Sequence, residues 1–282
     1  MEDKIKHKPY HFVIYALLTV ISLIWLSPLA WLILSSLRLE SGALTSYIMP
    51  KGYTLDNYKR LFTETSQFNY PRWYMNSFIV AIFSCLIATV FVLGVSFAFS
   101  RLKFTTKKLM MNLILILGMF PGFMSMIAIY HILKSIGLDG TLIALVLVYS
   151  GGAGLGYYIQ KGFFDTIPVA LDEAALLDGC TKFQLMYKII LPMSKPIITY
   201  TILTAFTAPW GDFIFASVIM KDNYQNYTLA VGLYRMTERE YLYQFFTRFC
   251  AGAVLIAIPI TILFINMQKY YVSGVTGGAV KG

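Results

Sequence analysis

Residues 78–99 read FIVAIFSCLIATVFVLGVSFAF, a stretch of 22 residues without a charged side chain. A helix needs about 20 apolar residues to cross the roughly 30 Å hydrocarbon core of a bilayer, so this stretch is long enough to span a membrane. A helix on the surface of a soluble protein keeps a polar face, and this stretch has none. It therefore predicts a membrane-spanning helix.

Five further runs reach a similar length, and the one Asp, Glu, Lys or Arg residue within all six runs is Asp212. Of the 282 residues, 57% are hydrophobic and 13% are charged, whereas about 25% are charged in an ordinary globular domain. The sequence predicts an all-α integral membrane protein with one transmembrane domain over residues 1–282. The six predicted spans are residues 12–37, 78–99, 109–133, 141–159, 197–220 and 249–267.

The distribution of Lys and Arg in the connections indicates the orientation of the spans, because cytoplasmic connections are enriched in both residues. Residues 101–108, RLKFTTKK, hold four basic residues in eight positions, and three lysines precede the first span. The link after the third span, KSIGLDG at 134–140, holds one. We expect both termini to be cytoplasmic. The first span is too long for a secretion signal and lacks a clear cleavage site, so we expect it to be retained.

This orientation leaves one sizeable cytoplasmic loop, residues 160–196 between the fourth and fifth spans. Local signals in this loop predict two short helices joined by a turn. Asp165 or Thr166 is the expected cap of the first helix, and Gly179 is expected to end it with a positive φ. The loop is therefore predicted to be structured.

The second helix of the loop is predicted to open with a capping box formed by Thr181 and Gln184, and to end near Pro192. Both short helices are amphipathic. Such a segment could dock into a groove on a cytoplasmic partner, or lie along the membrane surface against the protein's own spans. The residues by themselves leave both alternatives open.

A spaced set of residues in the same loop resembles the EAA motif of ATP-binding-cassette importer permeases. The motif consists of EAA, three residues, G, nine residues, I, one residue and LP, and every fixed position is met between the fourth and fifth spans. The matching residues are Glu173, Ala174, Ala175, Gly179, Ile189, Leu191 and Pro192.

Other segments are similar to carbohydrate importers, in particular the maltose/maltodextrin-type permease subunits. They are NSFIVA at 76–81, AFSRLKF at 98–104, KGFFDTIPVALDEAALLDG at 161–179, YTLAVGLY at 227–234 and SGVTGGAVKG at 273–282. One departure is Gly211, which precedes Asp212 where the carbohydrate group commonly has an asparagine.

The resemblance implies a transport subunit, not an enzyme, in the bacterial plasma (inner) membrane. It would import maltose, maltodextrin or a related oligosaccharide, with another sugar or polyol as the alternative. Its implied partners are a second permease, a cytoplasmic ATPase dimer that carries ATP and Mg²⁺, and an extracytoplasmic sugar-binding protein. The residues implied in ATPase coupling are Glu173, Ala174, Ala175, Gly179, Leu191 and Pro192, and those of the tail are Gly277, Gly278 and Lys281.

The residues agree with an external source of energy, and they give no sign of a cofactor or metal held by the chain. No G-x-x-x-x-G-K-[ST] phosphate loop occurs, and GGAGLG at 151–156 lacks the lysine. His131 has no carboxylate or cysteine at ligand spacing. The basic residues form no stripe with interleaved aromatic residues, which argues against a nucleic-acid partner.

Asp212 stands out because an ionisable side chain inside a span normally faces a cavity or a partner. We expect Asp212, with Trp210, to line or gate the sugar path, and a structural partner on a neighbouring helix is the alternative. An ion-coupled secondary transporter is the rival class for the whole chain. It would be expected to carry several ionisable groups at the midplane and an internal repeat, whereas Asp212 stands alone.

Overall fold

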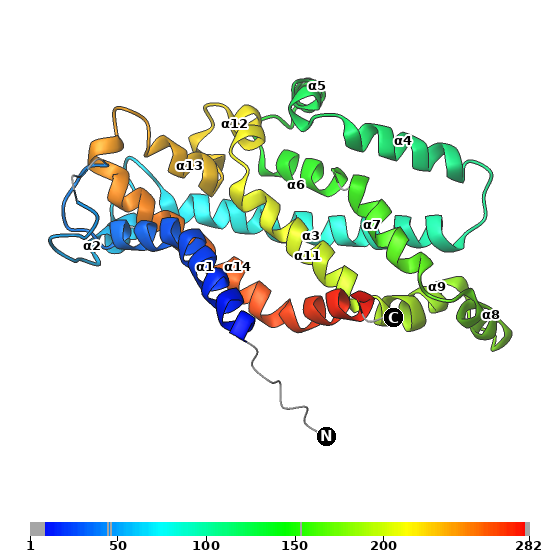
Figure 1. Cartoon of the computed structure of the whole chain (residues 1–282). Coiled ribbons are helices and arrows are strands. Elements are labelled where there is room, and N and C mark those ends of the chain that lie inside the picture. The colour runs from blue at the N-terminus through cyan, green and yellow to red at the C-terminus, as the bar shows by residue number, and fades with distance from the viewer. Residues whose placement is uncertain (1–8, 44, 46, 153, 280–282) are drawn as a thin grey trace. The chain divides into compact units, whose positions relative to one another are not determined.

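The computed structural model describes residues 9–43, 45, 47–152 and 154–279. Within these residues the chain forms helices, and its β structure is limited to a single bridge between Arg38 and Tyr53. The chain divides into two compact units (Figure 1). Unit 1 comprises residues 1–69 and 233–255, and unit 2 comprises residues 70–232 and 256–282.

Unit 2 is organised around α3, Tyr70–Arg101, a helix of 32 residues that contains the span predicted at 78–99. Small side chains on α3 allow neighbouring helices to approach closely, because little side-chain volume lies between the two backbones. The buried small residues of α3 include Ser77, Ala81, Ser84, Cys85, Ala88 and Ser96. The helices that pack on α3 are α6, Leu142–Gly151, α7, Gly154–Asp165, and α11, Lys195–Gly211 (Figure 1).

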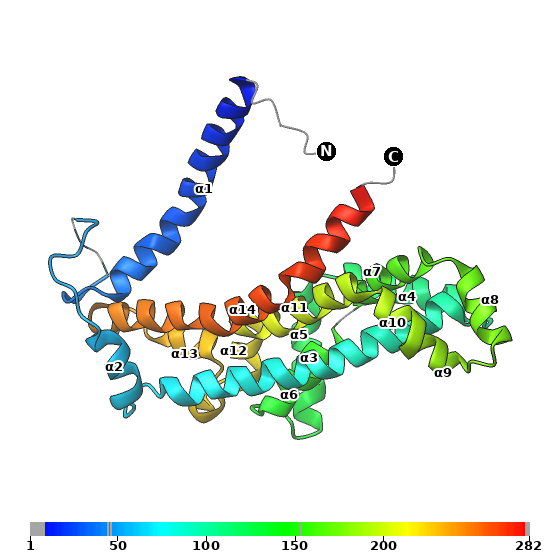
Figure 2. The same cartoon turned by 90° about the horizontal axis from the view of Figure 1, so that it is seen from below.

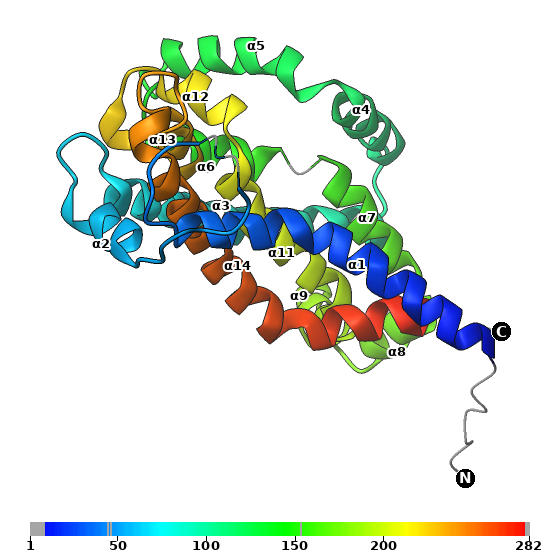
Figure 3. The same ribbon diagram turned by 60° about the vertical axis from the view of Figure 1, so that its left-hand side comes forward.

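The span predicted at 109–133 is two helices, α4, Lys107–Met119, and α5, Gly122–Ser135. The axes of residues 107–119 and 124–135 differ by 105°, and the bend is visible in Figure 3. Phe120 is extended, with φ −67° and ψ 134°. Pro121 explains the break, because proline disfavours the helical conformation in the residue before it and has no N–H to donate.

Two further predicted spans are also divided. The span at 141–159 comprises α6 and α7, which are bent by 41°, and α7 continues beyond its predicted end to Asp165. The span at 197–220 comprises α11 and α12, Ile214–Met220, with Asp212 extended between them. Three of the six predicted spans are therefore each formed by two helices.

Three helices in the described part of the chain are long and apolar enough to cross a membrane alone. They are α1, Pro9–Ser36, α3, and α14, Leu242–Ala279. Up to six spans result, by length and composition, if each of three bent helix pairs counts as one. These pairs are 107–119 with 124–135, 142–151 with 154–165, and 182–193 with 195–211. The apolar side chains of α1 are exposed along Phe12–Trp25, as expected for a helix surrounded by lipid.

Unit 1 contains a buried hydrogen-bond centre at Asn57 of α2, Asp56–Thr63. The Asn57 amide nitrogen donates to the carbonyls of Ser36 and Arg38, at 3.0 and 2.8 Å, and its oxygen accepts from the Thr247 hydroxyl at 3.0 Å. One side chain thus joins the end of α1, α2 and the first part of α14. Buried amides are commonly satisfied in this way.

The first turns of α3 hold the segment that leads to α13, Leu229–Arg235. The Asn76 amide donates to the carbonyls of Gln225 and Tyr227, both at 2.9 Å. The segment includes the short 3-10 turn η2, Tyr224–Asn226. Gly232 of α13 lies directly against the Trp73 ring, where a Cβ atom would be 2.1 Å from Trp73 Cε3. This close approach requires glycine.

Candidate coupling site

The first helix of the predicted loop is α8, Val169–Leu177, which follows Pro168. Asp165, one of the two expected caps, is instead the last residue of α7. Its carboxylate accepts from the Ser100 hydroxyl at 2.7 Å and binds Lys161 Nζ at 2.5 Å. The predicted start of α8 was wrong because Pro168 disfavours helix in the residue before it, which delays the helix to Val169.

The turn after α8 has the geometry predicted from Gly179. Gly179 has φ +81°, and its N–H donates to the Leu176 carbonyl at 3.1 Å. The Cys180 N–H donates to the Ala175 carbonyl at 2.9 Å. These two bonds form a Schellman motif, which satisfies carbonyls at the end of a helix and places a left-handed residue at its exit.

The second part of the segment begins with α9, Lys182–Leu185. The predicted capping box is confirmed, since the Thr181 N–H donates to Gln184 Oε1 at 2.8 Å and the Gln184 N–H donates to Thr181 Oγ1 at 3.2 Å. The helix then widens into a π-helical turn, η1, Met186–Ile190, before α10, Leu191–Met193.

Pro192 gives a physical reason for the π turn. A proline ring clashes with the carbonyl four residues earlier in an α-helix, and a wider turn moves that carbonyl away. The Leu191 N–H donates to the carbonyl of Met186, five residues earlier. The Ser194 hydroxyl satisfies the Ile190 carbonyl at 2.7 Å. The chain therefore turns toward α11 without leaving the Ile190 carbonyl unpaired.

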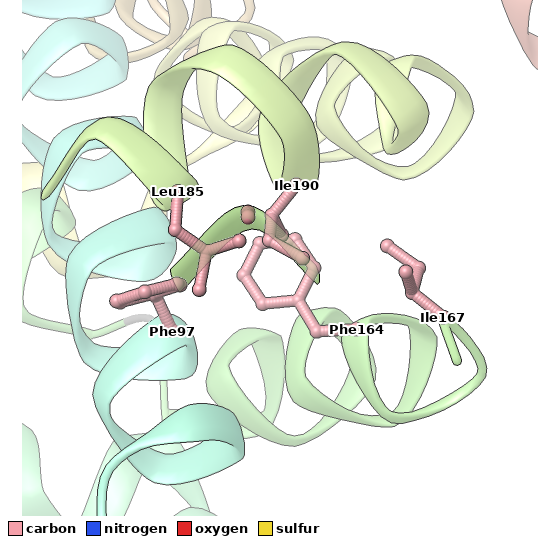
Figure 4. Packing of buried hydrophobic residues seen from close by; sticks show 6 residues of the cluster. Phe97, Phe164, Ile167, Leu185 and Ile190 are labelled. Atoms are coloured by element: carbon pink, nitrogen blue, oxygen red, sulfur yellow. The ribbon is translucent and has the colours of Figure 1, made fainter. Parts of the chain in front are cut away.

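A hydrophobic cluster fixes this segment to the ends of α3 and α7 (Figure 4). Side chains from both short helices meet one side chain from α3 and one from α7. The buried members are Phe97, Phe164, Ile167, Ala175, Leu185 and Ile190. Figure 4 shows Leu185 and Ile190 pointing toward Phe97 and Phe164. The segment is therefore packed on unit 2 and is not a free loop.

Apart from two buried residues, the residues of α8 are exposed, and several of them are apolar. Leu177 is the most open, with 89% of its surface accessible, and Val169, Leu171 and Leu176 are also exposed. α8 and α9 lie at the end of unit 2 where α3 ends (Figure 2). A group of exposed apolar side chains on a short, well-held helix is typical of a contact surface. Leu177 was missed in the sequence, where only the motif positions were singled out.

The six residues predicted for ATPase coupling divide between two environments. Glu173, Ala174, Gly179 and Pro192 are exposed. Ala175 is buried in the hydrophobic cluster, and Leu191 is partly buried against it. The exposed members can contact a partner directly, whereas Ala175 and Leu191 help to hold the segment in place.

An ion pair joins α8 to α3. Arg101, the last residue of α3, places Nε 2.7 Å from Asp172 Oδ2, and both side chains are almost fully buried. Arg101 Nη2 also donates to the Ile167 carbonyl at 2.9 Å. Burial raises the pKa of Asp172, and the nearby Arg101 charge opposes that rise. From the sequence, Arg101 is expected only to contribute to membrane orientation, because its partner is 71 positions away in the chain.

Asp212 and Trp210 lie at the break between α11 and α12. The Asp212 carboxylate accepts from the Tyr149 hydroxyl of α6 at 2.8 Å and from the Phe215 N–H at 3.0 Å. Asp212 thus has a partner on a neighbouring helix, which was the structural alternative for this residue. Trp210 is 1% exposed, and its ring lies among those of Tyr74, Phe78 and Phe206.

Two of the three predicted tail residues lie within the described structure. Gly277 and Gly278 belong to α14, which continues as helix well past the span predicted at 249–267. Lys281 lies outside the described residues.

Comparisons with known proteins give the class. Residues 90–277 match the family described as "Binding-protein-dependent transport system inner membrane component". The chain is 36% identical to the galactooligosaccharides transport system permease protein GanQ of Bacillus subtilis, over 95% of this chain and 94% of that protein. It is 33% identical to the maltodextrin transport system permease protein MalD of Streptococcus pneumoniae, over 99% and 98%.

A bacterial ABC transporter that imports the acidic polysaccharide alginate has a similar fold. Its matching chain has a TM-score of 0.77 and 19% identity, over 93% of this chain and 96% of that chain. The fold and the matches together define a multi-pass inner-membrane transport permease. The chain belongs to the binding-protein-dependent permease family of ABC transporters, among its sugar permeases. The resemblance noted in the sequence is confirmed.

Membership of this family indicates which subunits hydrolyse ATP. Permeases of this family are transport subunits, not enzymes, and they work with a second permease, an ATPase and a binding protein, so ATP is hydrolysed on separate subunits. An ion-coupled secondary transporter, the rival class, does not agree with this membership.

Proposed function

We propose that this chain is one of two permease subunits of an ATP-driven importer of oligosaccharides, of the maltose/maltodextrin type. The names of its relatives support this class of substrate, since GanQ is named for galactooligosaccharides and MalD for maltodextrin. Another sugar or polyol is the alternative substrate. The partner permease, an ATPase dimer and an extracytoplasmic sugar-binding protein complete the importer, and ATP and Mg²⁺ bind the ATPase.

The proposed topology has six membrane crossings, with both termini and residues 160–196 in the cytoplasm. It counts α4 with α5, α6 with α7, and α11 with α12 as one crossing each. The dense basic stretch at 101–108 supports the orientation. This topology places it on the cytoplasmic side with α8, and cytoplasmic connections are enriched in Lys and Arg. Helix breaks at membrane depth are tolerated where the freed backbone groups are buried in protein or line a cavity.

The observation that carries the proposal is the form of the segment from α8 to α10. Its inner face is packed on unit 2, its outer face presents Glu173, Ala174 and Leu177, and Gly179 sets the exit of α8. A short amphipathic helix of this kind suits a groove on a protein partner. We assign the ATPase as that partner, and Glu173, Ala174, Ala175, Gly179, Leu191 and Pro192 as the residues that form or support the contact.

Two other regions complete the assignment. Asp212 and Trp210 belong to the region of the sugar path, where the break between α11 and α12 provides a place for a change of conformation. Trp210 is buried in this conformation, so contact between its side chain and sugar requires a second conformation in which Trp210 is exposed. The tail, with Gly277, Gly278 and Lys281, extends the cytoplasmic contact with the ATPase.

Purification of the complex tests this function. The chain is expressed with its candidate partner permease, ATPase and binding protein, and ATP hydrolysis is measured in lipid with and without maltodextrin. We expect the four proteins to co-purify, and maltodextrin with binding protein to stimulate hydrolysis. Absence of any association with the ATPase would overturn the proposal. Stimulation by a different oligosaccharide alone would change the substrate and leave the class intact.

A further inference from the structure

The helix α8 is held in place by few of its own residues. Of its nine residues, Asp172 and Ala175 are buried, one turn apart on the same face. Ala175 contributes one methyl group to the hydrophobic cluster. Apolar contact of this kind is non-directional, so it leaves the rotation of α8 about its axis weakly defined. A more specific contact must come from the Asp172 carboxylate.

Arg101 supplies that contact as a close ion pair, although Arg101 Nε and Asp172 Oδ1 make no hydrogen bond within the described residues. Its Nε lies 2.7 Å from Asp172 Oδ2, with 7% and 10% of the two side chains exposed, and its Nη2 donates to the Ile167 carbonyl at 2.9 Å. One planar guanidinium therefore binds both the first turn of α8 and the residue just before Pro168. A guanidinium fixes geometry better than an ammonium group because its donors form a rigid fork.

The Arg101 side of this ion pair belongs to α3, the helix on which the other helices of unit 2 pack. Arg101 is the last residue of α3, which packs on α6, α7 and α11. The adjacent Ser100 hydroxyl donates to Asp165, the last residue of α7, at 2.7 Å. The end of α3 is thus bonded to both α7 and α8. A displacement of α8 that keeps these bonds must displace the end of α3.

We propose that Arg101 is a positioning residue that couples α8 to the spans: through the Arg101–Asp172 pair, movement of α8 is passed to α3. This inference rests on the proposed function, because it takes the cytoplasmic ATPase as the source of that movement. The pair suits this role because opening it would leave two buried charges uncompensated, so it stays closed while α8 moves. An apolar contact could slide instead.

A double-mutant cycle tests the coupling. The complete importer is reconstituted in liposomes with wild-type chain, Asp172→Asn, Arg101→Gln and the double variant, and the sugar transported per ATP hydrolysed is measured. Coupling between sites commonly changes an equilibrium 5- to 150-fold, so we expect each single variant to lower the ratio about tenfold. The double variant should be no lower than either single variant, because the two residues act through one contact.

Controls separate coupling from folding. Lys103→Gln removes an exposed positive charge two residues after Arg101 and should keep the wild-type ratio. Arg101→Lys keeps the buried charge but not the fork, and should give an intermediate ratio in a complex that assembles normally. If the neutral variants assemble poorly, Arg101→Lys carries the test. A thermal unfolding midpoint measured for each complex shows whether it is folded.

Three results would overturn the role of Arg101. They are a wild-type ratio in the single variants and in Arg101→Lys, losses that multiply in the double variant, or loss of assembly in every variant including Arg101→Lys. These differ from failure of the proposed function, which would appear as a wild-type complex without ATP-driven uptake and would remove the basis of this inference as well.

Discussion

The hydroxyl of Tyr149 donates a hydrogen bond to the carboxylate of Asp212, with 2.8 Å between the two oxygens. The bond joins α6 to the break between α11 and α12, and the same carboxylate accepts from the Phe215 N–H at the start of α12. One acidic side chain thus stabilises the break from two directions. This arrangement explains how a carboxylate is accommodated within an otherwise apolar run.

We expect Asp212→Ala and Tyr149→Phe to impair sugar uptake in complexes that still assemble. Each change leaves a former partner without its hydrogen bond, at a cost of about 1–3 kcal/mol, which loosens the break without removing a helix. Uptake of labelled sugar is measured in cells with matched amounts of complex in the membrane. Ser217→Ala is the control, because the Ser217 hydroxyl donates only to Ile214 within α12 in the described structure. Loss of the assembled complex would instead indicate a purely structural role.

Gly179→Ala should weaken coupling through the backbone alone. Gly179 has φ +81°, and no atom lies within 4 Å of the position of a Cβ, so the strain is conformational and not steric. A left-handed conformation costs an ordinary L-residue about 1–2 kcal/mol, whereas Asn adopts it more readily. We expect Gly179→Ala to reduce ATP-driven uptake and Gly179→Asn to retain most of it, with membrane insertion unchanged. Equal uptake by both variants would count against this turn as a determinant of coupling.

Leu177→Ser should weaken binding of the ATPase without destabilising the permease. Leu177 is highly exposed on α8 and makes no contribution to the hydrophobic cluster. The matched variant is Leu185→Ala, since Leu185 lies inside the cluster and its truncation should cost about 2–5 kcal/mol of stability. Co-purification of the ATPase and the thermal midpoint of the permease are measured for both. A lowered midpoint with normal ATPase binding in Leu177→Ser would contradict the docking surface.

Gly232→Ala is expected to destabilise the contact between α13 and the start of α3. The new Cβ would lie 2.1 to 2.7 Å from three atoms of the Trp73 ring, so the ring or the helix must move. Overpacking of this kind typically costs about 1–3 kcal/mol, measured as a lower thermal midpoint of the purified permease. Gly162→Ala in α7 is the control, because no atom lies within 4 Å of its Cβ position. A lowered midpoint in the control alone would be contrary to this account.

Features set by neighbouring residues could be predicted from the sequence. The positive φ of Gly179 and the capping box of Thr181 and Gln184 depend on a few consecutive residues, and both are present in the structure. The apolar runs likewise indicated where helices lie. The EAA motif identified a segment that proves to be ordered and packed on unit 2.

Features set by packing could not be predicted in the same way. The run predicted as one span at 109–133 is divided at Pro121 into two helices whose axes differ by 105°. The burial of Ala175 and the pairing of Arg101 with Asp172 depend on where α3 ends in space. No periodicity within α8 distinguishes Ala174, which is exposed, from Ala175, which is buried.

Sugar accumulation in proteoliposomes tests the central claim most directly. The complex is reconstituted without an ion gradient, with ATP and Mg²⁺ on the ATPase side and binding protein with labelled maltodextrin on the other. The account predicts accumulation that requires both ATP and binding protein, and that falls when Glu173 is replaced by Ala while the complex remains intact. Accumulation that needs an ion gradient and not ATP, or no transport of any oligosaccharide by the intact complex, would contradict it.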